Sequence, residues 1–182
     1  MKDMDLATAR IEKAIALNEN ILVYGDYDVD GTTAVSLVSS YLLTRHPNVA
    51  TYIPDRYGEG YGISYKGIDF ASDNDMALII ALDCGVKAID KVAYAQEKGI
   101  DFIICDHHRP GELLPEAIAV LDPKRTDCSY PYDELCGCGI GFKLIQALEA
   151  TTGGEINEIV PYLDLVATAI GADIVPITGE NR

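Results

Sequence analysis

The stretch Tyr24-Gly25-Asp26-Tyr27-Asp28-Val29-Asp30-Gly31 decides the fold of this chain. It places three carboxylates at alternate positions, directly after the apolar run Ile21 to Tyr24 and directly before a helix-like segment, Thr32 to Arg45. A buried strand that ends in acids places them at the carboxyl edge of a sheet, where open α/β folds bind ligands. Acids this close together repel one another, so a fold that gathers them usually holds a cation.

Two other interpretations fit part of this stretch. One is a solvated loop, because acids before a glycine are common turn residues. The other is a calcium-binding EF-hand loop, which also opens with Asp-x-Asp-x-Asp-Gly. Counted from Asp26, however, the twelfth position is Leu37, where that loop needs a bidentate glutamate. The segment before Asp26 is also strand-like rather than helical, so the EF-hand interpretation is rejected.

Size and composition are those of one soluble globular domain of 182 residues, 48% apolar and 24% charged. No apolar run reaches the length of a membrane span, and the N-terminus lacks a signal-peptide core, so we expect no membrane contact. Five cysteines without a disulfide-scaffold spacing favour reduced thiols in a cytoplasm. The formal net charge of −15 counts against a stand-alone nucleic-acid binder, because phosphate contacts need lysine and arginine.

Strand-like apolar runs alternate with helix-like segments along the whole chain. This order predicts an α/β fold, a doubly wound, mainly parallel five-stranded sheet with helices on both faces, forming a single domain over residues 1–182. The expected strands are Ile21–Tyr24, Val49–Ile53, Met76–Leu82, Asp101–Cys105 and Ala117–Leu121. The expected helices are Met4–Asn18, Thr32–Arg45, a short helix from the cap Ser64 to about Phe70, Lys87–Lys98, Gly139–Ala150 and Ile156–Ile170.

Residues able to bind metals follow three of the expected strands. Asp26, Asp28 and Asp30 follow the first, Asp83 follows the third, and Asp106-His107-His108 follows the fourth. The carboxyl ends of parallel strands share one edge of the sheet, so these side chains are expected to converge. Carboxylates with imidazole suit Mn²⁺ or Mg²⁺ better than structural zinc, and a pair of such ions suits phosphodiester hydrolysis.

Two further segments carry residues that bind metals elsewhere. Cys136-Gly137-Cys138 is interpreted as structural, because a lone Cys-x-Cys lacks the second ligand pair of a zinc site. The run Gly171 to Pro176 is expected to form a turn that carries another acid, Asp173. The chain has no phosphate-binding Walker loop, no Gly-x-Gly-x-x-Gly and no serine nucleophile elbow, so kinase, dinucleotide-binding and esterase functions lack support.

Asp106-His107-His108 resembles the signature of the DHH phosphoesterase superfamily. The segment Gly25 to Ala34 resembles the first motif of its RecJ branch, the single-strand-specific 5′→3′ DNA exonucleases. Pro54 to Gly62 resembles that branch's loop after the second strand, and Leu135 to Leu144 and Asp164 to Arg182 resemble its later motifs. The resemblance covers nearly the whole chain and implies a DHH catalytic domain from which the C-terminal substrate-binding domains are absent.

The resemblance also implies the roles of individual residues around two Mn²⁺ or Mg²⁺ ions. Asp83 would bridge the ions and Asp26 would be a weaker ligand. His108 would contact the scissile phosphate or act as general acid, and Asp106 would orient a neighbouring imidazole. The implied metal ligands are Asp26, Asp28, Asp30, Asp83, His107 and Asp173, and the implied contacts to substrate phosphates are Arg56, Arg109 and Tyr61.

The partners implied are single-stranded DNA with a 5′ end and the missing C-terminal domains, in DNA repair and recombination. One alternative is a small-molecule phosphoesterase of the same superfamily, acting on nanoRNA, a cyclic dinucleotide or pyrophosphate. The segment Arg56 to Gly62 favours the RecJ branch, which it resembles specifically. The other alternative is a replication scaffold of the same fold without metal ligands, but the matched ligands are all present here.

Overall fold

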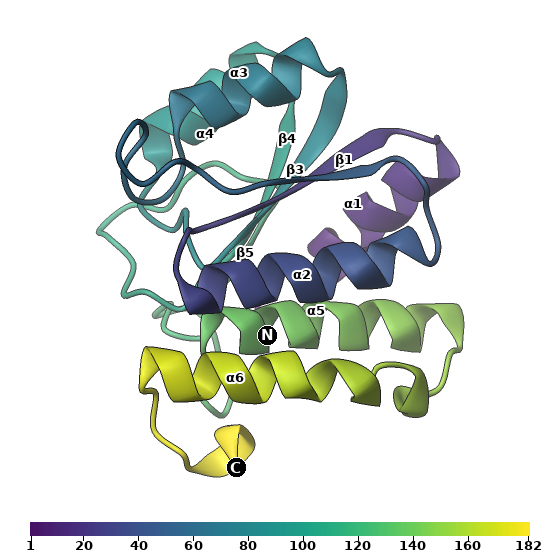
Figure 1. Ribbon diagram of the computed structural model, residues 1–182, viewed down its shortest axis with the longest axis vertical. Coiled ribbons are helices and arrows are strands. Elements are labelled where there is room, and N and C mark those ends of the chain that lie inside the picture. The colour runs from purple at the N-terminus through teal and green to yellow at the C-terminus, as the bar shows by residue number, and fades with distance from the viewer.

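A computed structural model describes residues 1–182 and contains one five-stranded sheet in which every strand pairing is parallel. The strand order is β2-β1-β3-β4-β5 (Figure 1). The predicted α/β fold class is therefore confirmed. The strands are β1 Asn20–Gly25, β2 Val49–Tyr52, β3 Met76–Leu82, β4 Asp101–Cys105 and β5 Ala119–Leu121.

Helices cover both faces of this sheet (Figure 1). One face carries α3 and α4, and the other carries α1, α2 and α5, with α6 packed on the outside of α2 and α5. No helix combines the length and the apolar character that crossing a membrane requires. The helices are α1 Met4–Ala16, α2 Val29–Leu43, α3 Tyr65–Asp73, α4 Ile89–Glu97, α5 Gly137–Thr152 and α6 Leu163–Asp173, with short 3₁₀ turns at Ile156–Glu158, Val160–Tyr162 and Gly179–Asn181.

The central strand β3 shows why the chain folds into layers. Successive side chains of a strand point to opposite faces of the sheet. Leu78 and Ile80 pack with α1, α2 and α5, whereas Ile79 packs with α3 and α4, and all three are fully buried. Burying each of these side chains stabilises the fold by about 1.5–3 kcal/mol. The continuous apolar run of β3 is thus explained by burial on both faces.

The strand order creates a switch point between β1 and β3. The chain leaves β1 through α2 to reach β2 on one side, and it returns through α3 to β3 on the other side. The loops after β1 and β3 therefore diverge to opposite faces and leave a crevice at the carboxyl ends of these strands. Asp26 follows β1 and Asp83 follows β3, so both acids lie at this crevice.

The helices differ in extent from the sequence-based expectation, and the differences in α2, α5 and α6 affect the site. Helix α2 begins at Val29 rather than Thr32, so Asp30 lies in its first turn. Helix α5 begins at Gly137 rather than Gly139. The segment before Leu163 forms 3₁₀ turns rather than the start of a long helix, because Pro161 lacks the backbone N–H that an α-helix needs there. Helix α6 then runs on to Asp173, which is its last residue and not part of a turn.

Ser64 is the N-cap of α3, as the sequence predicts. Its hydroxyl oxygen accepts a hydrogen bond from Gly67 N at 2.9 Å and donates to Glu59 Oε2 at 2.5 Å. Glu59 Oε2 also accepts from the hydroxyl of Tyr52, and Glu59 Oε1 accepts from Asp55 N. These contacts fix the loop between β2 and α3 to the sheet.

We therefore expect Ser64→Ala to lower the free energy of unfolding by about 0.5–2 kcal/mol, the range for loss of an N-cap. Urea unfolding followed by circular dichroism measures this change. Ser36→Ala is the matched control, because Ser36 is exposed in the body of α2 and caps no helix. Equal stability of the two variants would contradict the capping role.

Candidate metal centre

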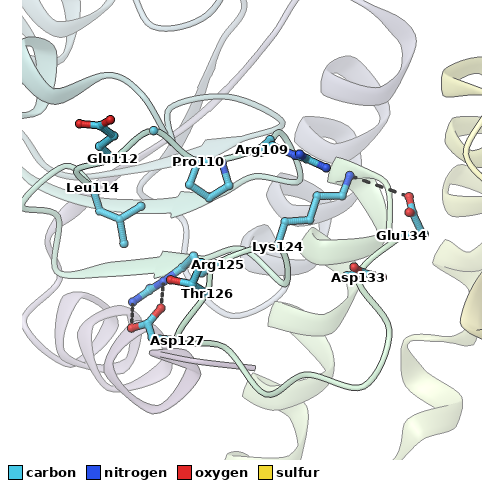
Figure 2. A pocket seen from close by; sticks show the side chains of 11 residues that line it. Arg109, Pro110, Glu112, Leu114, Lys124, Arg125, Thr126, Asp127, Asp133 and Glu134 are labelled. Carbon is cyan, nitrogen blue, oxygen red and sulfur yellow. Dashed lines mark hydrogen bonds and ion pairs between the residues drawn. The ribbon is translucent and has the colours of Figure 1, made fainter.

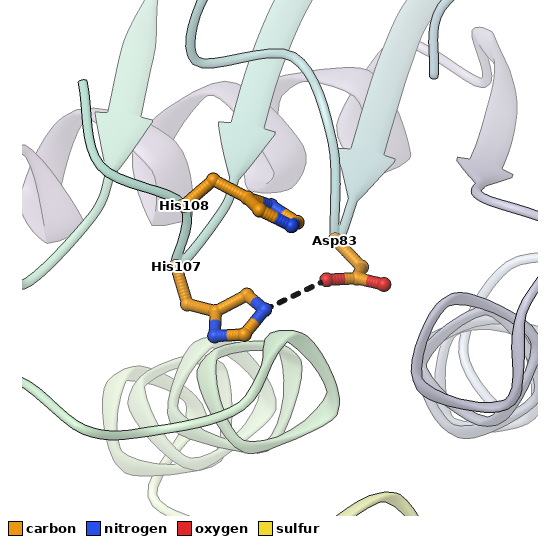
Figure 3. Close-up of side chains that lie close together, drawn as sticks. All are labelled: Asp83, His107 and His108. Atoms are coloured by element: carbon orange, nitrogen blue, oxygen red, sulfur yellow. Dashed lines mark ion pairs between the residues drawn. The ribbon is translucent and has the colours of Figure 1, made fainter. Parts of the chain in front are cut away.

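Side chains from four parts of the chain converge at the carboxyl edge of the sheet. His107 Nε2 lies 3.2 Å from Asp83 Oδ1 (Figure 3). The same nitrogen lies 3.7 Å from Asp30 Oδ2 and 3.6 Å from Asp173 Oδ2. The convergence expected from the strand ends is therefore present, and α6 adds its last residue to it.

These side chains form overlapping groups of potential metal ligands. Asp30, His107 and Asp173 make one group, whose ligand atoms lie within 4.8 Å of one another. A second group includes Asp26 and Asp28 together with Asp83, and Asp83 also forms a group with His107 and His108. Asp83 is thus the carboxylate within reach of both sides of the centre.

Asp30 is held by the beginning of α5. Its Oδ2 accepts a hydrogen bond from Gly137 N at 2.6 Å, and its Oδ1 accepts from Cys138 N at 2.7 Å. The N-terminus of a helix has free N–H groups and favours negative charge, so it fixes this buried carboxylate in place. Sequence reasoning missed this contact, because the two segments are more than a hundred residues apart and only Cys136-Gly137-Cys138 marked the position.

The same helix start explains the glycine at position 137. A Cβ atom at Gly137 would lie 2.5 Å from Asp83 Cβ and 2.7 Å from Asp83 Oδ1, too close for any side chain. Asp83 itself has a φ of 59°, in the left-handed region that few residues other than glycine adopt. Strain of this kind is found where function fixes a side chain in place. Cys136 caps α5, because its sulfur accepts a hydrogen bond from Gly139 N.

Asp106 and His108 form a hydrogen-bonded pair beside the centre. Asp106 Oδ1 lies 2.7 Å from His108 Nδ1, and Asp106 also accepts from the backbone N–H groups of His107, His108 and Val86. Burial acts to raise the pKa of Asp106, but these hydrogen bonds outweigh it and lower the pKa. The hydrogen bond to Asp106 raises the pKa of His108. On its other side, His108 Nε2 lies 3.0 Å from the hydroxyl of Tyr61.

The buried carboxylates of the centre would be stabilised by a nearby positive charge. Burial raises the pKa of Asp83 well above its usual range, and the nearby Asp30 and Asp28 raise it further. Burial likewise raises the pKa of Asp30 and of Asp26. Asp26 Oδ2, Asp83 Oδ1 and both ring nitrogens of His107 are buried without a hydrogen-bond partner. Buried polar groups normally have partners, so the chemistry of these atoms fits that of ligands to a cation.

Arg56 and Arg109, two of the three predicted phosphate contacts, form no ion pair with the carboxylates of the centre. The guanidinium of Arg56 lies 5.3 Å from the ring centroid of Tyr27 and is exposed. Arg109 follows His108 and lines a cavity of about 540 Å³, where it lies beside Lys124 on the loop after β5 (Figure 2). Lys124 was not among the site residues expected from sequence, because isolated lysines in loops carry no motif. The third predicted contact, Tyr61, lies next to the centre, because its hydroxyl is 3.0 Å from His108 Nε2.

The parallel sheet and its edge of carboxylates and imidazole define an α/β domain with a candidate centre for divalent cations. The model of the DHH family, N-terminal domain, matches residues 20–170. The chain therefore belongs to the DHH family. The resemblance of the motif Asp106-His107-His108 to the signature of the DHH superfamily is thus confirmed.

Relatives with high similarity are RecJ proteins. The single-stranded-DNA-specific exonuclease RecJ of Bacillus subtilis is 42% identical over 182 residues, which are 100% of this chain and 22% of that protein. RecJ of Escherichia coli is 35% identical over 191 residues, covering 94% of this chain and 33% of that protein. A crystal structure of exonuclease RecJ bound to manganese has a TM-score of 0.90 at 30% identity, covering 100% of this chain and 46% of that one. The chain thus spans about a fifth to a third of these curated relatives.

The contact between Gly137 and Asp83 yields a prediction for cation binding. Gly137→Ala introduces a Cβ that displaces the Asp83 side chain, so we expect Mn²⁺ affinity to fall by about 10–100-fold, the usual effect of disturbing the support of a ligand. Calorimetric titration with MnCl₂ measures it. Gly139→Ala is the matched control in the same helix, because its Cβ would meet no atom closer than 3.6 Å. The assignment is wrong if both variants bind Mn²⁺ equally.

The raised pKa values of the buried carboxylates yield a second prediction, that cation binding releases protons. A carboxylate whose pKa is raised keeps its proton at a pH where a free aspartate has lost it, and a cation must displace that proton to bind. We expect Mn²⁺ binding near pH 7 to release protons and to weaken as the pH falls. Calorimetry in two buffers of different ionisation enthalpy counts the protons. Asp83→Asn should release fewer, and a binding enthalpy independent of the buffer would contradict the prediction.

Proposed function

We propose that this chain is the catalytic lobe of a RecJ-like, metal-dependent phosphodiesterase that hydrolyses single-stranded DNA from its 5′ end in DNA repair and recombination. The observation that carries this proposal is the convergence of Asp30, Asp83 and Asp173 on His107 Nε2 at the switch point of a parallel sheet. Similarity to RecJ proteins over the whole chain supports the substrate class. We place the activity in the cytoplasm.

The metal ligands proposed come from two of the three groups, one that contains Asp83 and one whose His107 lies 3.2 Å from Asp83. Asp26 and Asp28 would hold one cation with Asp83, and Asp30, His107 and Asp173 would hold the other, with Asp83 between them. Oxygen ligands with a single imidazole suit Mn²⁺ or Mg²⁺. Such a pair of ions activates water and neutralises phosphoryl oxygens when bound. The relatives with solved structures are described with manganese or magnesium bound, which supports this choice.

His108 is the proposed acid that protonates the leaving oxygen. The hydrogen bond from its Nδ1 to Asp106 fixes the ring, so Nε2 points into the space beside Tyr61. The hydrogen bond to Asp106 favours the protonated form of His108 and raises its pKa, which suits a proton donor. The buried Asp106 is in turn held by three backbone N–H groups. Asp106 therefore acts through His108 and not on the substrate.

The proposed contacts to substrate phosphates are Arg56, Arg109 and Tyr61. Lys124 is added to them because it lines the same cavity as Arg109. They are few for a polyanionic substrate, because the chain carries 14 basic residues against 29 acidic ones. At this net charge, long-range electrostatics oppose the approach of DNA. The RecJ relatives are longer than this chain, and domains in their additional sequence would supply the remaining contacts. Such C-terminal domains are the proposed partners of this lobe.

The activity test compares this chain with a full-length RecJ relative on a 5′-phosphorylated single-stranded oligonucleotide at equal Mn²⁺. We expect the chain to hydrolyse it at least about a hundredfold more slowly, the scale of misplaced substrate. Parallel reactions contain a cyclic dinucleotide, nanoRNA or pyrophosphate. Faster hydrolysis of one of these small substrates would replace the DNA proposal with a small-molecule phosphoesterase, and rates equal to the relative's would show that this lobe holds DNA alone.

The bridging role of Asp83 is tested by Asp83→Asn. Asparagine keeps the volume and tolerates the left-handed backbone, but it removes the charge that two cations would share. We expect the number of Mn²⁺ ions bound per chain to fall, while the circular dichroism spectrum stays the same. Asp90→Asn, an exposed acid at the start of α4, serves as the control. An unchanged stoichiometry in Asp83→Asn excludes the bridge.

A further inference from the structure

A second hollow is lined in part by His108. It has a volume of about 270 Å³ and opens between the loop of Tyr61 and the start of α4. Ile63 and Val86 are among its apolar walls, and both are almost fully buried. Lys87 and Lys91 also line it. None of the proposed metal ligands contributes to this hollow.

The walls of the hollow are fixed in place. Tyr24 OH donates to the backbone oxygen of Gly62 at 2.9 Å and accepts from Ser64 N at 3.1 Å, so the loop beside Tyr61 is tied to β1. On the opposite wall, Val86 N donates to Asp106 Oδ2 at 2.9 Å. The hollow is thus formed before any ligand binds, as ligand sites usually are.

We infer that this hollow receives one unpaired base of the nucleic-acid substrate, an inference that rests on the proposed function. It opens beside His108, so a group that enters it belongs to the nucleotide whose phosphate His108 faces. Pockets for whole ligands begin at about 300 Å³, so this volume suits one ring system better than an entire nucleotide.

Three features favour a base over another ring system. The Tyr61 side chain is largely exposed beside the hollow, and aromatic faces stack on unpaired bases. Ile63 and Val86 offer apolar surface to the faces of a flat ring. Lys87 and Lys91 place positive charge where the neighbouring phosphates would run, in a chain of −15 net charge.

The chemistry of the walls also predicts the kind of selectivity. Both carboxylate oxygens of Asp106 already accept hydrogen bonds, so this acid has little capacity left to read a base edge. The hollow therefore accepts any of the four bases. A base held in a duplex cannot enter it without breaking its pair, which costs free energy that an unpaired base does not pay. The hollow is therefore expected to favour single strands over duplexes and to show no preference for sequence.

The test uses the 182-residue chain with Mg²⁺ and two ligands that lack a phosphodiester bond, thymidine 5′-monophosphate and deoxyribose 5-phosphate. Nuclear magnetic resonance follows the methyl signals of Ile63 and Val86 and the ring signals of His108. We expect thymidine 5′-monophosphate to move all three sets of signals. The sugar phosphate, which has no base, should move those of His108 alone. Methyl signals that stay still while thymidine 5′-monophosphate moves His108 would overturn the inference.

A pair of variants on α4 and its cap gives an independent readout. Ala88→Leu fills the hollow, so we expect thymidine 5′-monophosphate to bind about tenfold more weakly, with deoxyribose 5-phosphate unaffected. Ala93→Leu is the same change at an exposed position of α4 outside the hollow and should leave both affinities unchanged. Equal losses for both ligands would contradict a base site. If neither ligand moves the His108 signals, no phosphate binds beside His108 and the proposed role of His108 fails, a result distinct from failure of the base site alone.

Discussion

Mutual repulsion among the carboxylates at the carboxyl edge of the sheet is the constraint on which the rest of the structure depends. Asp26, Asp30 and Asp83 are almost fully buried, where an uncompensated charge is costly. The fold compensates part of it with backbone dipoles, since the start of α5 donates two N–H groups to Asp30. Atoms that still lack partners, such as Asp83 Oδ1, leave the rest of the compensation to cations.

The switch point explains why this cluster forms where it does. The loops after β1 and β3 diverge there, and the space between them is closed by the start of α5. Close approach of that helix requires glycine at position 137, and close approach of α2 to the loop after β1 requires Gly31, whose Cβ would lie 2.5 Å from the backbone oxygen of Asp26. Small residues therefore position the acids, although they take no part in the chemistry.

Much of this could be predicted from the sequence, because strand periodicity is local and parallel strands share their carboxyl edge. The meeting of Asp83 with His107 follows from that rule alone. The contact between Asp30 and α5 does not, since it depends on tertiary packing between segments far apart in the chain. Asp173 was expected in a turn, but the apolar packing of α6 on α2 and α5 carries the helix through it. Local patterns place strand ends well and helix ends poorly.

Charge separates two tasks that the proposed function combines. A centre that binds cations needs closely spaced acids, whereas a surface that binds DNA needs arginine and lysine. In this chain the acids dominate, and basic residues line two hollows, Arg109 and Lys124 the one and Lys87 and Lys91 the other. Bound cations would change the sign of the local field only within about a Debye length of the centre. Under the proposed function, substrate would be attracted only over this short range, and a longer DNA strand would need the basic surface of the proposed partner domains to remain in place.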